Sequence, residues 1–309
     1  MEFRQIQYFV CLCEEGSVTR AARRLHIVQP ALSMQIAKLE EELGQRLFLR
    51  TPQGMQATAE GRRMYQLFLP VLAEFARARE LMLQSRGELS GQVRVGMIAT
   101  IAQGVLVDAL QEFSAAHPKV ELSLTDGFSG TLIDAVAVGQ LDAAVINKPR
   151  RPLTLKSEPI AEEDLILVTG TRHEPLPASL PFAELARLKL VLPTRQHGLR
   201  GIIESFAQTE DVNLAPSVEI DSIGAIVKLV QESNFCTLLP SIAVRKLLEQ
   251  GLLLAHAVAS PRLTRQIVSV TDARRPPSPA TAAFIAVLAR HVRGRDSGGD
   301  NAAGQPANV

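Results

Sequence analysis

The sequence predicts an α/β multidomain protein: an N-terminal winged helix-turn-helix, a long linker helix, and an α/β region that fills most of the remaining chain. Three observations predict it. Residues 17–44 hold two short helical patterns with room for only a turn between them. Residues 59–85 carry one long helical pattern that is apolar along one side. From residue 92 onwards, strand-like segments with every second residue apolar are each followed by a helical pattern. This succession predicts a parallel sheet with helices on its faces.

Two helices joined by a tight turn are predicted between residues 17 and 44. Ser17 is a typical N-cap for the first helix, Pro30 is typical of the first turn of the second, and Gly44 is typical of its end. The buried stripe of the second helix is formed by Leu32, Ile36, Leu39 and Leu43. This is the helix-turn-helix pattern, whose second helix enters the major groove of DNA. The alternative is a helical hairpin within a larger bundle.

The outward face of this second helix is small or polar at its N-terminal end, the end that reaches base edges. A step of about 100° per residue decides which side chains lie there. The outward residues are Pro30, Met34 and Lys38, with Gln29 and Ser33 at the edge of the face. The C-terminal half carries three consecutive carboxylates, residues 40–42, which phosphates would repel, so we expect that end to leave the groove.

A short two-stranded wing is predicted within residues 45–59, a polar stretch that contains Pro52 and Gly54. Arg50 and Thr51 lie at the base of this wing, where we expect them to contact phosphates, and such contacts position a domain without reading sequence. The net charge of the chain is only +1, so basic residues must act locally. About half of those in the first domain are expected to be plain solvated charges.

The long helix of residues 59–86 needs a partner for its apolar side. A helix that is long and apolar along one side usually pairs with a copy of itself. We therefore expect Phe68, Leu72 and Phe75 to carry a dimer contact, the alternative being that they pack on the core of their own chain. Pro70 is expected to kink or break this helix.

Cysteine usage and the N-terminus predict a cytoplasmic protein. The three cysteines are an odd number, the first residues do not form a secretory signal, and no apolar run approaches the ~20 residues of a membrane span. Cys11 and Cys13 point in different directions on a predicted helix, so we expect buried or half-buried thiols rather than a metal pair.

No pattern of catalytic residues is recognisable. The stretch Gly127-Phe128-Ser129-Gly130 is not a nucleophile elbow, because that motif requires glycine where Thr131 stands. The sequence has no dinucleotide-binding or phosphate-binding glycine motif, and its six histidines form no i, i+4 pair. We expect no enzymatic activity, no metal and no cofactor.

Polar residues follow the predicted strands, where open α/β sheets bind their ligands. The residues concerned are Thr100, Ser129 and Asn147 after the first three strands, and Thr194, His197 and Arg200 after a later one. Free N–H groups at helix N-termini favour anions, so we expect a small anionic ligand. Two alternatives stay open: that Thr100 and Ser129 act only as helix caps, and that Arg200 acts only in a surface ion pair.

Many positions of the first domain match one known family at fixed spacing. They are Phe3, Ile6, Phe9, Gly16, Ser17, Ala21, Ala22, Leu25, residues 29–33, Ile36, Leu39, Glu40, Leu43, Gly44, Leu47, Phe48, Arg50 and Thr58. With these residues, 1–63 resembles the N-terminal domain of LysR-type transcriptional regulators. The resemblance implies base contacts by Gln29, Pro30 and Ser33. Two positions depart from it: Met34 stands where the family often has Arg, Gln or His, and Val28 replaces a frequent Ser or Thr, which predicts weaker capping of the recognition helix.

The rest of the chain resembles the effector domain of the same family. The stretches LSLTDGFSGTLIDAVAVGQLDAAVI and TLLPSIAV carry this resemblance, which implies two α/β lobes like those of periplasmic binding proteins. Phe235 stands where the family often has Gly, so we expect its ring to narrow the cleft. The predicted boundaries are 1–58 for the DNA-binding domain, 59–86 for the linker helix, 87–91 for a hinge, 92–161 with 267–293 for lobe 1, 162–266 for lobe 2, and 294–309 for a disordered tail.

The resemblance implies a sequence-specific DNA-binding regulator controlled by a small effector bound between the lobes, which we expect to be an anion. It further implies a homodimer or homotetramer, double-stranded DNA with an interrupted palindrome as partner, and RNA polymerase as a partner if the protein activates. The alternative is a small-molecule binding protein or enzyme that carries an accessory helix-turn-helix.

Overall fold

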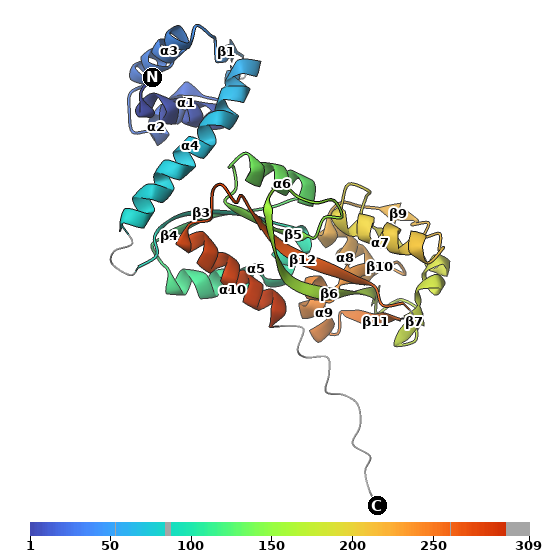
Figure 1. The fold of residues 1–309 in the computed structure, drawn as a ribbon. Coiled ribbons are helices and arrows are strands. Elements are labelled where there is room, and N and C mark those ends of the chain that lie inside the picture. Colours follow the sequence, from blue (N-terminus) through green and yellow to red (C-terminus); the bar gives the residue numbers. More distant parts are fainter. Residues whose placement is uncertain (53, 84–87, 260, 295–309) are drawn as a thin grey trace, which may run out of the picture. The chain divides into compact units, whose positions relative to one another are not determined.

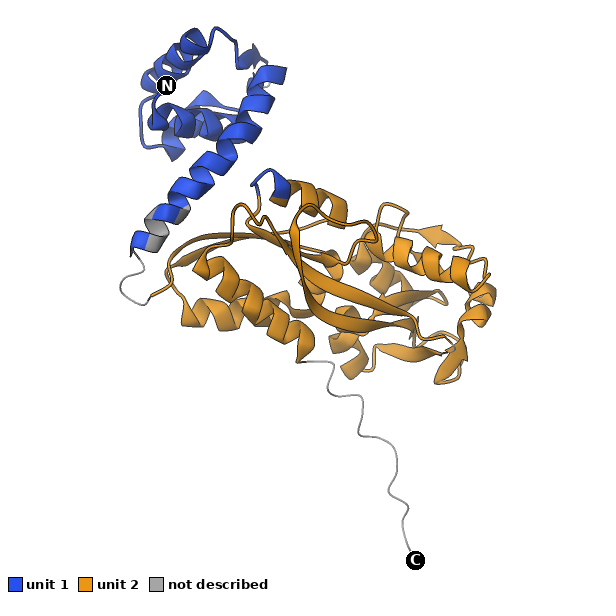
Figure 2. Ribbon diagram, viewed as in Figure 1, with its two compact units in different colours: residues 1–87, 137–140 blue, residues 88–136, 141–309 orange. Residues whose placement is uncertain are grey.

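The computed structural model describes residues 1–52, 54–83, 88–259 and 261–294. Two compact units make up the chain, residues 1–87 with 137–140, and residues 88–136 with 141–309 (Figure 2). Among the described helices, none has the length together with the apolarity that crossing a membrane requires.

The first unit is a winged helix-turn-helix followed by a long helix (Figure 1). Its elements are α1 (Phe3–Glu15), α2 (Val18–Arg24), α3 (Gln29–Leu43), β1 (Phe48–Thr51), β2 (Gly54–Ala57) and α4 (Ala59–Leu83). Strands β1 and β2 pair antiparallel, with Phe48 opposite Ala57. The winged helix-turn-helix and the long helix predicted from the sequence are thereby confirmed.

The helix ends of this unit follow the local sequence. Ser17 Oγ accepts a hydrogen bond from Arg20 N at 3.4 Å and caps α2. Gly44 ends α3 at φ 64°, a left-handed backbone conformation that glycine adopts at little cost. The N-cap of α3 is Val28, whose side chain accepts no capping hydrogen bond, as its lack of an oxygen predicts.

The core of the first unit includes one face of α4. Phe9 of α1 is fully buried, and its ring contacts those of Phe48 and Phe68 at centroid distances of 5.3 and 5.7 Å. Phe68 is only 7% exposed. This burial corrects the prediction that Phe68 carries a dimer contact: periodicity alone could not tell whether its own chain or a second copy covers this face. Leu72 also packs against this core.

Helix α4 continues through Pro70 without a break, although a kink or break was expected there. The ring of Pro70 removes one hydrogen bond, that to the carbonyl of Gln66. Gln66 is exposed, so solvent can replace the missing donor. The predicted hinge begins outside the described residues, at Gly87.

The second unit is a mixed α/β domain with two lobes (Figure 1). Its helices are α5 (Ala99–Ala116), α6 (Ser129–Ala137), the 3-10 helix η2 (Phe182–Arg187), α7 (Gly198–Thr209), α8 (Ile223–Glu232), α9 (Ser241–Glu249) and α10 (Pro279–Arg293). Its strands are β3 (Gly91–Met97), β4 (Val120–Asp126), β5 (Ala143–Asn147), β6 (Lys156–Gly170), β7 (Ser179–Pro181), β8 (Val191–Leu192), β9 (Val218–Glu219), β10 (Cys236–Pro240), β11 (Leu253–Ala259) and β12 (Thr264–Thr271).

One sheet extends through both lobes in the order β4-β3-β5-β12-β6-β11-β7, with β10 also paired to β6. The first half of β6 pairs with β12, and its second half pairs with β10 and β11. Strands β3, β4 and β5 are parallel, as expected, but β12 is antiparallel to both of its neighbours. The chain returns from lobe 2 directly into β12, without the crossover helix that parallel pairing needs.

Candidate functional site

The predicted DNA-reading residues lie on one exposed face of α3. The apolar residues Leu32, Ile36 and Leu39 hold the opposite face in the core. The exposed residues are Gln29, Pro30, Ser33, Met34 and Lys38, with Met34 63% exposed. Thr19 of α2 contacts the first of them, since its Oγ1 lies 3.4 Å from Gln29 Oε1. Arg50 is exposed on β1.

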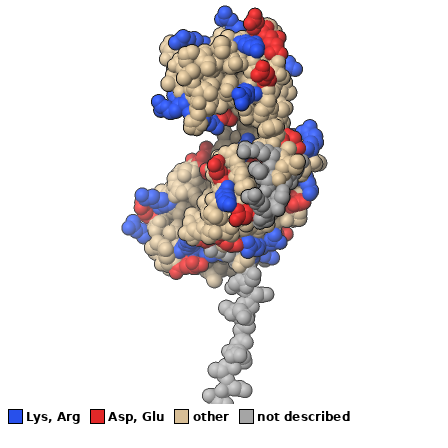
Figure 3. All heavy atoms as spheres, turned by 90° about the vertical axis from the view of Figure 1, so that its left-hand side faces the viewer, with Lys and Arg blue, Asp and Glu red and all other residues tan. Residues whose placement is uncertain are grey.

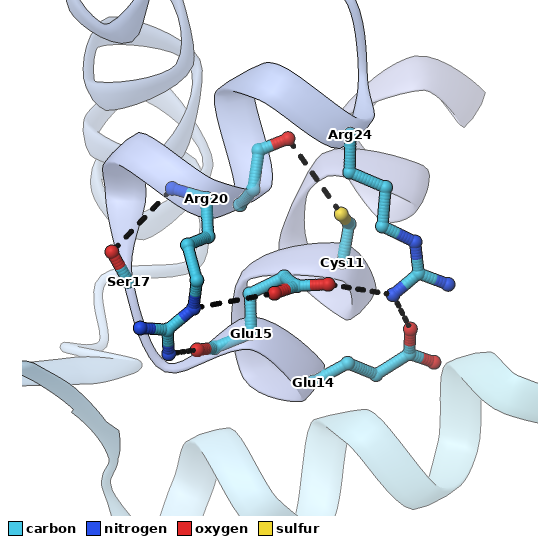
Figure 4. Close-up of polar contacts among 7 residues, drawn as sticks. Cys11, Glu14, Glu15, Ser17, Arg20 and Arg24 are labelled. Carbon is cyan, nitrogen blue, oxygen red and sulfur yellow. Dashed lines mark hydrogen bonds and ion pairs between the residues drawn. The ribbon is translucent and has the colours of Figure 1, made fainter.

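Two arginines of α2 are held by carboxylates at the end of α1 (Figure 4). Arg24 Nη1 lies 2.6 Å from Glu14 Oε2 and 3.2 Å from Glu15 Oε1, and Arg20 Nε lies 3.4 Å from Glu15 Oε2. These pairs offset the charges of Arg20 and Arg24, so these two arginines contribute less to a phosphate-binding surface than their number suggests. On the face drawn in Figure 3, basic and acidic side chains are interspersed, in keeping with the net charge of +1.

The acidic C-terminal half of α3 has a structural task that the sequence did not reveal. Glu40 Oε1 accepts hydrogen bonds from Leu47 N at 2.6 Å and Phe48 N at 3.0 Å. The carboxylate therefore anchors the start of the wing to the recognition helix. Such anchoring fixes β1, and with it Arg50, relative to α3.

In the second unit, three predicted polar positions of lobe 1 meet at the carboxyl ends of β3, β4 and β5. Thr100 lies in the first turn of α5, Ser129 begins α6, and Asn147 ends β5. Helix α6 can pack closely on β3 because residue 96 is glycine: a Cβ there would lie 2.5 Å from Leu132 Cδ2. Neither Thr100 nor Ser129 caps its helix, since Ile98 is the N-cap of α5 and Ser129 Oγ has no hydrogen-bond partner among the described residues.

A buried ion pair that the sequence analysis missed lies beside these residues. Arg265 of β12 stands opposite Glu163 of β6, and its Nε and Nη2 lie 2.7 and 2.5 Å from Glu163 Oε2. Its Nη1 donates to Thr100 Oγ1 at 2.8 Å and to Asn147 Oδ1 at 3.2 Å. The cation beside Thr100 is thus Arg265.

Lobe 2 faces this cluster with the N-terminus of α7. A Cβ added to Gly198 would lie 3.2 Å from Asn147 Nδ2 and 3.3 Å from Ser129 Oγ. The preceding residue, His197, caps the helix by accepting from Leu199 N at 3.2 Å, and its ring contacts that of Phe128 at a centroid distance of 5.8 Å. Burial, and then the positive charge of Arg265, lower the pKa of His197, so its imidazole is neutral at pH 7.

The structure does not bring three other predicted residues to this cluster: Thr194, Arg200 and Phe235. Arg200 Nη1 donates to Pro193 O at 3.0 Å and to Glu219 Oε1 at 2.8 Å, and its Nε donates to Glu204. Thr194 Oγ1 donates to Asp221.

Arg200 therefore makes the ion pair that was the alternative for it, although in a buried position. It also lines a hollow of ≈ 630 Å³ beside α7 and β9. The ring of Phe235 packs against the core of lobe 2, with Lys189 Nζ 4.2 Å from its centroid. These contacts explain the positions of the Arg200 and Phe235 side chains without a role in effector binding.

The thiols are free and shielded, as expected from the sequence. Cys11 and Cys236 are buried and Cys13 is half-buried. Burial raises the pKa of both Cys13 and Cys236 to about 12, so neither is a thiolate at neutral pH.

Fold and surfaces together define a class: a DNA-binding winged helix joined to a two-lobed domain of the kind that binds small molecules. Two family models match the chain. "Bacterial regulatory helix-turn-helix protein, lysR family" matches residues 3–62, and "LysR substrate binding domain" matches residues 86–293.

Relatives of known function agree with these matches. The chain is 31% identical over 290 residues to the nitrogen assimilation regulatory protein Nac of Klebsiella aerogenes, covering 93% of this chain and 94% of Nac. It is 30% identical over 258 residues to the HTH-type transcriptional regulator CzcR of Bacillus cereus, covering 84% and 86%.

Solved structures show the same fold. Full-length OxyR from Pseudomonas aeruginosa has a TM-score of 0.76 and 26% identity, with 95% of each chain covered. Full-length CbnR in complex with its target DNA has a TM-score of 0.70 at 22% identity, covering 94% of this chain and all of CbnR. The chain belongs to the LysR family of transcriptional regulators: it is a DNA-binding regulator controlled by a small molecule.

Proposed function

We propose that this regulator reads an interrupted palindrome as a dimer and that a small anion, bound between the two lobes of each effector domain, controls it. One observation carries the proposal. Two hydrogen-bond donors of lobe 1, Ser129 Oγ and Asn147 Nδ2, are buried without partners among the described residues, and both lie beside Gly198 of lobe 2. Buried polar groups are normally satisfied, so this unpartnered pair supports a ligand at this place.

Three helix N-termini support an anion at this place. Helices α5, α6 and α7 begin at Ala99, Ser129 and Gly198, next to the residues of the cluster. The first N–H groups of a helix lack partners within it and carry a partial positive charge, which favours anions. Arg265 is not a free charge for the ligand, because Glu163 neutralises it.

The DNA-reading part of the proposal rests on the exposed face of α3. We expect Gln29→Ala to weaken binding to the specific site by roughly 1–3 kcal/mol, since Gln can form two hydrogen bonds with one adenine. Binding to random DNA should change little. Arg50→Ala should instead weaken binding to both DNAs and lower the salt dependence, since it removes a phosphate contact.

Gel-shift titrations with DNA upstream of the gene and with random DNA of equal length measure both effects. Gln45→Ala, which removes an exposed glutamine beyond α3, serves as the control. Equal losses on both DNAs for Gln29→Ala would refute its role in base reading.

The dimer part of the proposal rests on the side of α4 that its own core leaves uncovered. Four apolar residues are exposed there, and we call them the α4 stripe: Leu67, Val71, Phe75 and Met82. With about 100° per residue they fall within about 80° of one another. Exposed apolar stripes of this kind mark interfaces, and a two-fold dimer implies two symmetric half-sites in the DNA. A pair of such dimers would form the tetramer.

The proposed effector site can be tested by adding one methyl group at Gly198. Gly198→Ala places a carbon 3.2 Å from Asn147 Nδ2 and 3.3 Å from Ser129 Oγ, where the anion would accept hydrogen bonds. Hydrogen bonds to charged groups contribute roughly 1.5–3 kcal/mol, so we expect effector affinity to fall roughly tenfold to hundredfold.

Calorimetry with the carboxylates selected by a thermal-shift screen measures this loss. Gly201→Ala is a matched control one turn further along α7, since a Cβ there meets nothing within 4 Å. An effector that binds Gly198→Ala as well as the wild type lies elsewhere.

A further inference from the structure

The buried guanidinium of Arg265 determines how its neighbours present their hydrogen-bonding groups. Its side chain is fully buried, and among the described residues its hydrogen bonds and ion pair are all with oxygens: Glu163 Oε2, Thr100 Oγ1 and Asn147 Oδ1. A guanidinium has five N–H donors and no acceptor. The atoms facing it must therefore be acceptors.

This requirement orients two side chains that are otherwise ambivalent. An amide has one acceptor end and one donor end, so with Oδ1 on Arg265 the NH₂ group of Asn147 is directed away from it. Thr100 Oγ1 accepts from Arg265 and keeps its own proton for donation. Asn147 is only 5% exposed, and its Nδ2 has no partner among the described residues.

We propose that Arg265 is a positioning residue: by holding the amide oxygen of Asn147 it leaves the NH₂ group of Asn147 as the donor beside Gly198, so that the effector is recognised there through an acceptor, as a carboxylate supplies. This inference rests on the effector site proposed above and specifies its chemistry. Asn147 Nδ2 and Ser129 Oγ supply the donors nearest to Gly198. Glu163 keeps the guanidinium in place and cancels its charge, so selection works through the direction of hydrogen bonds rather than through a free cation.

Acetate and acetamide are the appropriate probes, because they have nearly the same shape and differ by one acceptor and one donor. The amide NH₂ of acetamide would face the NH₂ of Asn147, and an unmatched buried donor weakens binding strongly. Ligand-observed NMR titration of their methyl signals against the full-length protein gives both affinities. We expect the wild type to bind acetate at least about tenfold more tightly than acetamide.

Two substitutions test the role of the named residues. Asn147→Asp keeps the oxygen toward Arg265 and replaces the outward donor by an acceptor, so acetate affinity should fall about hundredfold and the preference should reverse. Arg265→Lys retains a positive charge but cannot hold Glu163, Thr100 and Asn147 together, so the preference should disappear. Asn213→Asp, an exposed site elsewhere in lobe 2, is the control for added charge and should leave both affinities unchanged.

The outcomes separate this inference from the site itself. Equal affinities for the two probes in the wild type, or an unchanged preference in Asn147→Asp, would overturn the donor role of Asn147 that Arg265 sets. If the inference fails but acetate binding is still lost in Gly198→Ala, the proposed effector site is retained, and only the inference about Asn147 and Arg265 is withdrawn. Acetate binding that is indifferent to Gly198→Ala overturns both. Should Arg265→Lys fail to fold by circular dichroism, the isosteric Asn147→Asp still decides.

Discussion

Two glutamates on the α4 stripe, Leu67→Glu with Val71→Glu, are expected to convert the dimer into monomers and to abolish detectable operator binding. These side chains are 61% and 47% exposed, so the winged helix core should fold around the substitutions. In a dimer they would be buried, and four unpaired carboxylates in one interface are strongly unfavourable. A monomer engages one half-site only and forfeits the roughly 10²- to 10⁴-fold gain of linked binding.

Sedimentation velocity and gel shift on the palindrome measure assembly and binding. Gln66→Glu with Ala76→Glu is the matched control, since it adds the same charge to exposed positions of α4 outside the stripe. A stripe variant that sediments as a dimer and still binds the palindrome would show that the dimer forms elsewhere. Phe68→Glu would not be informative, because Phe68 lies in the core and its loss would unfold the domain.

Removing one member of the Arg265–Glu163 pair should strongly destabilise the effector domain. Arg265→Met removes the guanidinium that faces the carboxylate of Glu163, which is itself 1% exposed. Breaking such a pair costs roughly 3–5 kcal/mol, which for a domain of this size lowers Tm by about 6–20 °C. The double substitution Arg265→Met with Glu163→Leu should recover most of that loss, because it leaves no uncompensated charge.

Differential scanning calorimetry measures these shifts. The neighbouring pair Arg262–Asp164 is a matched control, because it joins the same two chain segments but lies exposed to solvent. Exposed pairs contribute little, so Arg262→Met should leave Tm nearly unchanged. Similar shifts for Arg262→Met and Arg265→Met would contradict the special cost of the buried charge.

Much of the fold was predictable because periodicity and end signals agree in this chain. Ser17 and Gly44 bound helices whose apolar spacing is regular, and the strand patterns of lobe 1 alternate clearly. Strand β7, with three residues, and η2, with six, are too short to carry a period and were not predicted; strand β11, with seven residues, was not predicted either. The antiparallel direction of β12 is set by where the chain re-enters lobe 1, and no local pattern encodes that.

The candidate effector site was predictable in position but only partly in composition. Thr100 and Ser129 follow strands, and the general geometry of α/β sheets places such residues together. Arg265 and Glu163 were missed because Arg and Glu are rarely buried. A signal existed: each stands just before an apolar strand segment, and their charges are opposite. Arg200 was selected although Glu204 follows it at the i, i+4 spacing of a helical ion pair; that Glu219 of β9 also engages it is not visible from position along the chain.

Strand β6 limits how the two lobes can move. It is a single strand of 15 residues, roughly 50 Å at about 3.3 Å per residue, and it belongs to both lobes. The lobes therefore cannot slide apart without breaking its ladders, and rotation about the β6–β12 ribbon remains the soft motion. That ribbon carries a register shift between Ile267 and Val268, two residues beyond Arg265. An anion bound at the site proposed beside Asn147 and Ser129 would lie next to this ribbon, because Asn147 pairs with Ile267 of β12, and a small displacement there would become a large movement at the far ends of the lobes.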